Sequence, residues 1–180
     1  MPDNQIMDNL KERLKKIKLL LLDVDGVLTD GRIIYDSRCR DSKFFDVHDG
    51  MGVYALSKAG VKTALITARG SKAIKPRAKD MRVTDVFSDV SPKSAILPKL
   101  LKKYNVTRDE VCFVGDDLVD LGLMKLVGFG VAVFNACPEI KKSASYITVR
   151  HGGRGAVREV AELILKSQGK WEEIVNYYER

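Results

Sequence analysis

The sequence predicts an α/β fold, a doubly wound parallel β-sheet with helices on both faces. Short apolar runs at 19–22, 61–66 and 111–115 are typical of strands buried on both faces. Segments with helical periodicity separate these runs, and strands that alternate with helices form parallel sheets. Polar residues follow the apolar runs, so we expect the chemistry at the carboxyl ends of the strands.

Length and composition favour a single domain over residues 1–180. Hydrophobic residues make up 45% of the chain and charged residues 31%, which argues against disorder. The formal net charge of +7 favours acidic partners such as a phosphorylated substrate, a nucleic acid or a membrane surface. The sequence contains neither a basic stripe interleaved with aromatic residues nor an apolar run of membrane length, so we expect no nucleic acid and no membrane partner. We expect a cytoplasmic protein.

The N-terminal part predicts an amphipathic helix and a protruding β-hairpin. Apolar residues recur at three- and four-residue steps within 1–17, the pattern of a helix with one buried face. Residues 31–47 predict the hairpin, with strands at 32–35 and 43–47 around a polar turn at 36–42. The hairpin is richer in apolar side chains than a lone hairpin leaves in water, so we expect a partner subunit there.

The remaining elements alternate along the chain. The expected helices span 49–58, 71–79, 91–104, 138–143, 156–166 and 171–178, and the further strands span 83–87, 129–134 and 146–149. Ser71 is expected to cap its helix, and Pro98 is expected to kink the helix that contains it. The hairpin and one helix account for residues 26–66, so no cap domain fits between the first two strands.

Two carboxylates follow the first strand. Side chains alternate along an extended backbone, so Asp23 and Asp25 point the same way and can address one reacting centre. Two adjacent negative charges require a cation or a shared proton, which predicts a bound Mg²⁺ or an acid paired with a base. Asp and Gly are also common turn residues, and a simple turn would give the same tetrapeptide. The functional interpretation therefore depends on partners elsewhere in the chain.

Phosphoryl transfer through an acyl phosphate would use the polar residue at each strand end. Asp23 would be the nucleophile, and Asp25 would protonate the leaving alkoxide and then activate water. Thr67 would bind a phosphoryl oxygen, and Lys93 would offset its charge. Mg²⁺ prefers oxygen ligands, and Asp23, the backbone carbonyl of Asp25 and Asp116 would supply them. The next carboxylates along the chain, Asp117 and Asp120, are expected to orient these ligands.

These residues carry a resemblance to a known family. The segment 23–31, Thr67, Lys93 and the Gly-Asp-Asp of 115–117 resemble, in order, the four motifs of the haloacid dehalogenase-like phosphatases. The Leu-Thr-Asp-Gly end of the first motif, the Phe-x-x-x-Asp-Gly-x-Gly of 45–52 and the segment 152–159 resemble the subfamily that acts on 3-deoxy-D-manno-octulosonate 8-phosphate. This resemblance implies a Rossmann-like fold and a Mg²⁺-dependent hydrolase of lipopolysaccharide biosynthesis that acts on a small phosphorylated sugar acid.

The resemblance also implies substrate contacts and an assembly. The contacts would come from Asp25, Asp46, Val47, His48, Asp49, Gly50, Tyr54, Arg69, Arg77 and Lys93. The chain departs from the family at Ala68, where a glycine is usual, so the backbone would approach a phosphate less freely. The implied homotetramer is assembled through the 31–47 hairpin, so that the hairpin and the C-terminal tail of one chain complete the site of another.

Other interpretations are open from the residues alone. Within the phosphatases, the substrate could instead be a nine-carbon sialic-acid-type phosphate or the phosphorylated end of a protein or nucleic acid. A signalling receiver domain also uses clustered Asp, Thr and Lys, but its phosphorylated Asp would follow a middle strand, where this chain has Thr67 and Ser88. A non-catalytic binding or assembly module is the remaining alternative. Arg69 and Arg77 could also be ordinary solvated surface charges.

Overall fold

The computed structural model describes the backbone of residues 2–180 and the side chains from residue 8 onward. A six-stranded sheet forms its centre, and every pair of neighbouring strands is parallel. The strand order is β5-β4-β1-β6-β7-β8. The strands are β1 (Leu19–Leu22), β4 (Lys62–Ile66), β5 (Asp85–Phe87), β6 (Val111–Gly115), β7 (Phe129–Ala132) and β8 (Tyr146–Ile147). The predicted parallel sheet is confirmed.

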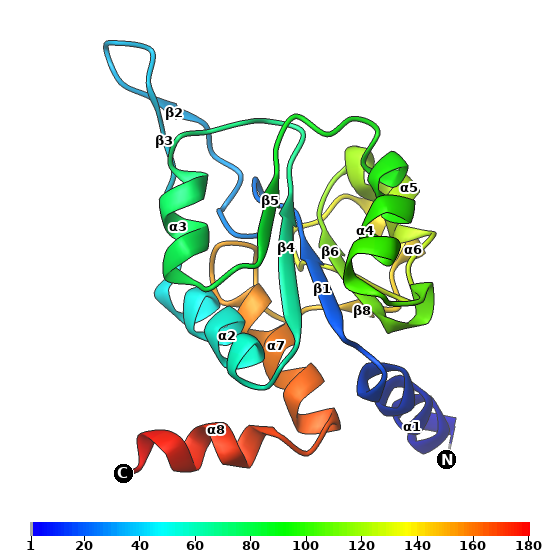
Figure 1. Ribbon diagram of the computed structural model, residues 1–180. Coiled ribbons are helices and arrows are strands. Elements are labelled where there is room, and N and C mark those ends of the chain that lie inside the picture. Colours follow the sequence, from blue (N-terminus) through cyan, green and yellow to red (C-terminus); the bar gives the residue numbers. More distant parts are fainter. Residues whose placement is uncertain (1) are drawn as a thin grey trace.

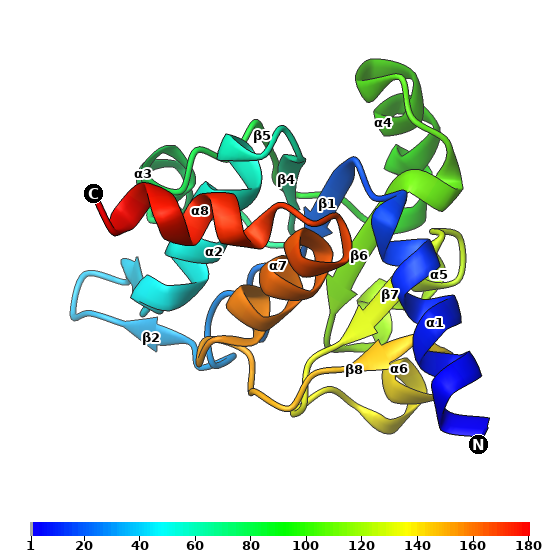
Figure 2. The ribbon, with the colours of Figure 1, turned by 90° about the horizontal axis from the view of Figure 1, so that it is seen from below.

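Helices cover both faces of this sheet (Figure 1). The α-helices are α1 (Pro2–Lys15), α2 (Val47–Lys58), α3 (Ile74–Asp80), α4 (Leu97–Tyr104), α5 (Leu121–Met124), α6 (Pro138–Ser143), α7 (Ala156–Ser167) and α8 (Trp171–Tyr178). Helices α2, α3 and α7 lie on one face and α4, α5 and α6 on the other, as the view from below also shows (Figure 2). Helix α7 packs against α1, α2 and α8. The doubly wound arrangement is therefore as predicted.

The core lies where β1 passes between these two layers. All four leucines of β1 are fully buried, because parallel strands covered by helices have no solvated face. Each such side chain contributes about 1.5–3 kcal/mol by leaving water. Strand β1 pairs with β4 on one side and β6 on the other, so its carboxyl end lies at the point where the chain switches faces. The fold thus holds β1 within the core and places its end at the expected ligand position.

The hairpin consists of β2 (Ile34–Tyr35) and β3 (Asp41–Ser42), and it projects beyond the carboxyl edge of the sheet (Figure 1). The second strand was expected at 43–47, but strand pairing ends at Ser42. The reason is Asp46, whose side chain accepts a hydrogen bond from the His48 N–H at 2.6 Å and caps α2. The helix therefore begins at Val47, before the expected start at residue 49.

Two expected helix features also differ in the structure. Pro98 lies in the first turn of α4, where its missing N–H costs nothing, so it begins a helix rather than kinking one. A 3₁₀ turn, η1 (Lys93–Ile96), precedes it. Ser71 accepts a hydrogen bond from the Ala73 N–H in a turn, and α3 begins later, at Ile74. Among the described residues, no helix combines the length and apolarity needed to cross a bilayer.

Candidate active site

The ends of β1 and β6 bring Asp23 and Asp116 together. The two strands pair in register, with Leu22 opposite Val114, and each aspartate directly follows its strand. Gly26 then turns the chain with φ +95°, and a Cβ at this position would lie 2.0 Å from Asp116 Oδ2. Only glycine fits both the backbone angle and this close approach. The turn that follows Asp23 is therefore shaped around the Asp116 carboxylate.

Lys93 joins this cluster from the start of η1. Its side chain is 1% exposed, and Nζ donates to Asp23 Oδ1 at 2.5 Å and to Asp120 Oδ1 at 2.6 Å. Asp120 is fully buried, and its Oδ2 accepts a hydrogen bond from the Asp116 N–H at 2.9 Å. Asp120 thus orients both Lys93 and the backbone of Asp116. The sequence analysis predicted that Asp120 orients the metal ligands. In the structure, Asp120 is itself one of the clustered carboxylates.

Burial and neighbouring charge raise the pKa values of Asp23 and Asp116. Burial, and then repulsion from Asp23 and Asp120, raises the pKa of Asp116 to about 8. Burial and the charge of Asp120 raise the pKa of Asp23 to about 6, against the opposing attraction of Lys93. Burial disfavours the charged form of Lys93, but its two carboxylate partners outweigh this and hold its pKa above the usual value. The cluster therefore holds three carboxylates and one ammonium, which pairs with Asp23 and Asp120.

This donor set fits a divalent cation. Oxygen atoms of Asp23, Asp116 and Asp120 all lie within 4.8 Å of one another. Three hard oxygen donors with excess negative charge suit Mg²⁺ better than a metal that favours nitrogen or sulfur. Asp117 lies outside this group, since it is exposed and its Oδ1 accepts a hydrogen bond from the Leu118 N–H at 2.8 Å. The backbone carbonyl of Asp25 stays a predicted ligand.

Thr67 follows β4, the other neighbour of β1. It is buried, and its hydroxyl donates to the Arg69 carbonyl oxygen at 3.0 Å and accepts from the Arg69 N–H at 3.1 Å. These bonds close a tight turn around Ala68, the position at which the chain departs from the family motif. The turn lies at the same edge of the sheet as Asp23. The contact between Thr67 and a phosphoryl oxygen stays a prediction.

Asp25 does not join the carboxylate cluster but pairs with a residue that the sequence analysis missed. The Lys43 ammonium donates to Asp25 Oδ1 and forms an ion pair with it. The Lys43 side chain is only 3% exposed, whereas that of Asp25 is 24% exposed. The one signal in the sequence was a lysine placed two residues before Phe45 in a segment expected to be a strand. That pattern is too common to identify a site residue.

Arg69 and Arg77 connect the hairpin and α2 to the neighbouring strand end. Arg69 Nη2 donates to the Tyr35 hydroxyl at 2.6 Å. Arg77 Nη2 donates to the Asp46 carbonyl oxygen at 2.7 Å, and its Nε is buried with no hydrogen-bond partner among the described residues. Both guanidinium groups therefore lie between the hairpin base and α3.

The segment 46–50 divides into exposed and buried residues. Val47 and the His48 side chain are largely exposed, at 73% and 67%. Gly50 is buried, and a Cβ there would lie 2.3 Å from Arg77 Nη2, so the guanidinium packs directly on its backbone. Asp46 caps α2, and its Oδ1 lies 3.2 Å from Nδ1 of His48. This part of the expected substrate surface is accessible only at its first residues.

Asp49 has a structural contact that the sequence analysis did not predict. It is fully buried, and its carboxylate accepts hydrogen bonds from the backbone N–H groups of Gly155 at 3.3 Å and Arg158 at 2.9 Å. These donors lie at the N-terminus of α7, whose unpaired N–H groups attract a negative charge. Burial raises the pKa of Asp49 to about 6. Asp49 ties α2 to α7, and its contact with a substrate stays a prediction.

Tyr54 also lies away from the carboxylate cluster. Its ring packs 4.5 Å from the Arg82 guanidinium and 5.7 Å from Lys58 Nζ. Lys58 ends α2 and Arg82 follows α3, so both lie at the amino edge of the sheet, opposite Asp23. The substrate contact of Tyr54 stays a prediction, and within one chain its ring packs against Lys58 and Arg82.

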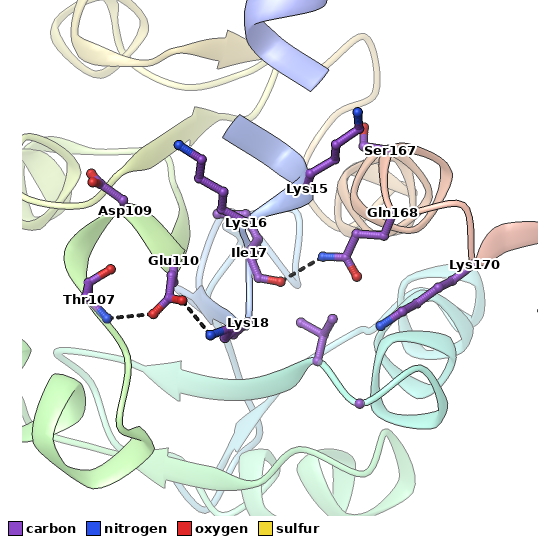
Figure 3. A pocket seen from close by; sticks show the side chains of 12 residues that line it. Lys15, Lys16, Ile17, Lys18, Thr107, Asp109, Glu110, Ser167, Gln168 and Lys170 are labelled. Atoms are coloured by element: carbon purple, nitrogen blue, oxygen red, sulfur yellow. Dashed lines mark hydrogen bonds and ion pairs between the residues drawn. The ribbon is translucent and has the colours of Figure 1, made fainter. Parts of the chain in front are cut away.

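A cavity of about 640 Å³ opens at this amino edge (Figure 3). Figure 3 shows that polar side chains of its lining already have partners within the chain: Lys18 pairs with Glu110 at 2.6 Å, and Gln168 donates to the backbone carbonyl oxygen of Ile17 at 2.8 Å. Lys18 directly precedes β1, so the whole length of that strand separates the cavity from Asp23. The cavity contains none of the residues to which the sequence gave a role.

Comparison with known proteins places this geometry in a family. A model of haloacid dehalogenase-like hydrolases matches residues 80–160. The 3-deoxy-D-manno-octulosonate 8-phosphate phosphatase of Escherichia coli is 40% identical over 161 residues, which cover 89% of this chain and 86% of the relative. The enzyme of the same name from Yersinia pestis is 38% identical over 93% of this chain and 89% of the relative.

Solved structures agree with these sequence matches. The Moraxella catarrhalis 3-deoxy-D-manno-octulosonate 8-phosphate phosphatase, crystallised with magnesium, phosphate and the sugar acid KDO, superposes with a TM-score of 0.93 at 39% identity, covering 96% of this chain and 99% of the other. The cobalt-bound Haemophilus influenzae enzyme gives a TM-score of 0.85 at 35% identity over 88% and 92% of the two chains. The chain belongs to the 3-deoxy-D-manno-octulosonate 8-phosphate phosphatases, within the haloacid dehalogenase-like hydrolases.

Proposed function

We propose that the chain is a Mg²⁺-dependent phosphatase that hydrolyses 3-deoxy-D-manno-octulosonate 8-phosphate to the free sugar acid and phosphate. The observation that carries this proposal is the buried cluster in which Lys93 bridges Asp23 and Asp120 beside Asp116. Such a cluster provides a nucleophile, a fixed positive charge and oxygen ligands at one strand end. The names of the relatives support the choice of substrate, and with it a place in lipopolysaccharide biosynthesis.

In the first step, an Asp23 carboxylate oxygen attacks phosphorus opposite the sugar oxygen. The new O–P bond forms as the bond to the sugar oxygen breaks, and Asp25 donates a proton to that oxygen as it leaves. Lys93 already contacts Asp23 and offsets the negative charge that gathers around the transferring group. Thr67 would hold one phosphoryl oxygen.

In the second step, water attacks the phosphorus of the aspartyl phosphate. Asp25, now a carboxylate, takes a proton from this water, and the bond between phosphorus and Asp23 breaks. Phosphate leaves, and Asp23 is again free to react. Splitting a slow hydrolysis into two displacements lowers each barrier, which is the advantage of a covalent route.

Asp23, the backbone carbonyl of Asp25 and Asp116 would hold the Mg²⁺. When bound, the ion supplies the positive charge that offsets repulsion between the attacking carboxylate and the phosphate. Asp120 keeps Lys93 and the backbone of Asp116 in place through its two hydrogen bonds. Asp117 is exposed and would act only through the turn that it caps.

We expect the sugar acid to bind between the hairpin base and α3. A planar guanidinium binds a carboxylate through two parallel hydrogen bonds, and Arg69 and Arg77 are placed there. The buried Nε of Arg77, which has no hydrogen-bond partner in the described part of the chain, supports this assignment. Asp46, Val47, His48 and Gly50 would form the adjoining wall.

A homotetramer through the 31–47 hairpin would cover this open site. The support is the exposure of apolar hairpin side chains, Ile33 at 58% and Phe44 at 66%, which a monomer leaves in water. Light scattering after gel filtration should give four chains per particle, and Ile33→Ser with Phe44→Ser should give smaller particles. A matched Ile147→Ser change, at a side chain 43% exposed in the edge strand β8, should leave the particle size unchanged. We further propose that residues 1–180 are one domain and that the protein is cytoplasmic.

Phosphate release from a panel of substrates tests the function. We expect the eight-carbon sugar acid 8-phosphate to be turned over with a higher kcat/KM than a nine-carbon sialic-acid-type phosphate, a phosphorylated oligonucleotide or an aryl phosphate. Activity should require Mg²⁺, and Asp23→Asn should lower kcat by roughly 10³-fold or more. Full activity of Asp23→Asn would remove the nucleophile assignment, and a preference for the nine-carbon substrate would change the substrate alone.

A further inference from the structure

The strongest feature that the proposed mechanism does not use is the Lys43 side chain. It follows β3 directly, is 3% exposed, and its ammonium pairs with Asp25. Lysine is almost never fully buried unless its charge is paired. Asp25 is the one carboxylate with which Lys43 forms an ion pair among the described residues. The position of Lys43 therefore depends on Asp25.

The orientation of the Asp25 side chain depends in turn on Lys43. It lies beyond the end of β1, it is 24% exposed, and Lys43 is its one ion-pair partner in the described part of the chain. A carboxylate at such a site can occupy several rotamers of similar energy unless another group selects one. An acid that serves both steps of a displacement must face the same oxygen position each time, and small misplacement costs rate.

We propose that Lys43 is the positioning residue of Asp25, holding its carboxylate toward the oxygen that leaves in the first step and the water that enters in the second. This inference rests on the proposed function. The ammonium reaches Asp25 from the hairpin, whose last paired residue is Ser42. The orientation of the catalytic carboxylate is thereby tied to the hairpin, and a shift of the hairpin would disturb proton transfer without changing the residues around Asp23.

The leaving group provides a direct test. An alkyl phosphate such as the sugar 8-phosphate needs a proton on its leaving oxygen, whereas p-nitrophenyl phosphate releases a stable anion without one. The parameter kcat/KM covers only the steps up to leaving-group departure. Lys43→Met keeps the length of the side chain and removes its charge. We expect it to lower kcat/KM for the sugar phosphate by roughly 10- to 100-fold, and for the aryl phosphate by less than about threefold.

Two further comparisons separate positioning from a general structural role. Lys43→Arg keeps the charge and should restore most of the lost kcat/KM. In an Asp25→Asn background, Lys43→Met should cost almost nothing further, since residues that act as one unit are not additive. Lys62 is an exposed lysine at the amino end of β4, and Lys62→Met should have the kcat/KM of wild type with both substrates. Melting curves show whether each variant folds, and Lys43→Gln is a second neutral variant.

Equal losses with both substrates, or losses that add to those of Asp25→Asn, would overturn the proposal and indicate direct substrate binding by Lys43. A crystal structure of Lys43→Met with the Asp25 carboxylate in its wild-type orientation would overturn it as well. If wild type hydrolyses the aryl phosphate but not the sugar 8-phosphate, the proposed substrate fails instead. The same comparison then uses whichever alkyl phosphate the enzyme accepts.

Discussion

The Lys93 ammonium donates a hydrogen bond to Asp23 Oδ1 at 2.5 Å, although 70 positions separate the two residues. The same ammonium reaches Asp120, so one buried cation joins the end of β1 to the turn after β6. Neither carboxylate could be buried beside Asp116 without it, because isolated charges are costly to remove from water. Lys93 therefore serves the fold and the chemistry together.

Lys93→Met should destabilise the protein and abolish turnover. Removing one partner of a buried ion pair leaves its carboxylates unpaired, which costs about 3–5 kcal/mol. Urea unfolding measures this free energy, with Lys62→Met as the exposed lysine control. Added Mg²⁺ should return part of the stability, because it supplies charge to the same carboxylates, but it should not return activity. A variant as stable as wild type without Mg²⁺ would contradict the role given to the ion pair.

The carboxylate cluster follows from sequence and simple geometry. Apolar runs at 19–22 and 111–115 predict two buried parallel strands, and the carboxyl ends of such strands share one edge of the sheet. Asp23 and Asp116 directly follow these runs, so their proximity could be predicted. Lys93 could be predicted less directly, since its place depends on the connection between β5 and η1. The four ordered motifs supplied that information.

Other features depend on tertiary contacts that no local pattern reports. Asp49 lies in a motif of the family, but its two hydrogen bonds come from α7, more than a hundred residues later. Lys43 is distinguished only by its burial against Asp25. The second hairpin strand was expected too late because alternation of apolar residues at 43–47 resembles a strand, whereas the cap at Asp46 favours the helix.

The stability gained from Mg²⁺ should increase with pH. The pKa of Asp116 is raised from an ordinary 3.8 to about 8 in the metal-free fold. Ionising Asp116 therefore costs the folded state stability, a penalty that is absent below about pH 4 and complete above about pH 8. Mg²⁺ binds the ionised form and competes with the proton. The melting temperature should rise more on Mg²⁺ addition at pH 8 than at pH 5.5.

Asp116→Asn is the control for this pH effect. The asparagine side chain cannot ionise, so the melting temperature of this variant should rise only slightly on Mg²⁺ addition at pH 5.5 and at pH 8. Without metal at pH 8, Asp116→Asn should have a higher melting temperature than wild type, because the substitution removes one of three carboxylate charges that repel one another. An equal response of wild type to Mg²⁺ at both pH values would show that Asp116 is ionised throughout and would contradict its raised pKa.

Asp49→Asn should weaken the fold while leaving the chemistry intact. An amide oxygen can accept from one backbone N–H, but the amide nitrogen cannot accept from the other, and the negative charge at the N-terminus of α7 is lost. We expect a loss of about 1–2 kcal/mol in unfolding free energy, the usual cost of a lost helix cap. At 25 °C, KM should change by less than about twofold. A large rise in KM with unchanged stability would restore the substrate contact expected from the sequence.

Gly26→Ala should weaken Mg²⁺ binding. Gly26, with φ +95°, and Gly60, with φ +85°, both adopt the left-handed backbone region, which costs other residues about 1–2 kcal/mol. A Cβ at Gly26 would also lie 2.0 Å from Asp116 Oδ2, whereas one at Gly60 meets no atom within 4 Å. Gly26→Ala and Gly60→Ala should therefore introduce similar backbone strain. Only Gly26→Ala would also displace the Asp116 carboxylate, a proposed metal ligand.

This pair separates strain from ligand displacement. Gly60→Ala should lower the melting temperature and leave the Mg²⁺ concentration for half-maximal activity unchanged. Gly26→Ala should lower the melting temperature and raise that concentration by roughly 10-fold or more, the range seen when metal-ligand orientation is disturbed. Titration calorimetry with Mg²⁺ measures the same change without turnover. If both variants bind Mg²⁺ as wild type does, the Asp116 carboxylate is not a ligand, and the glycine is required by the turn alone.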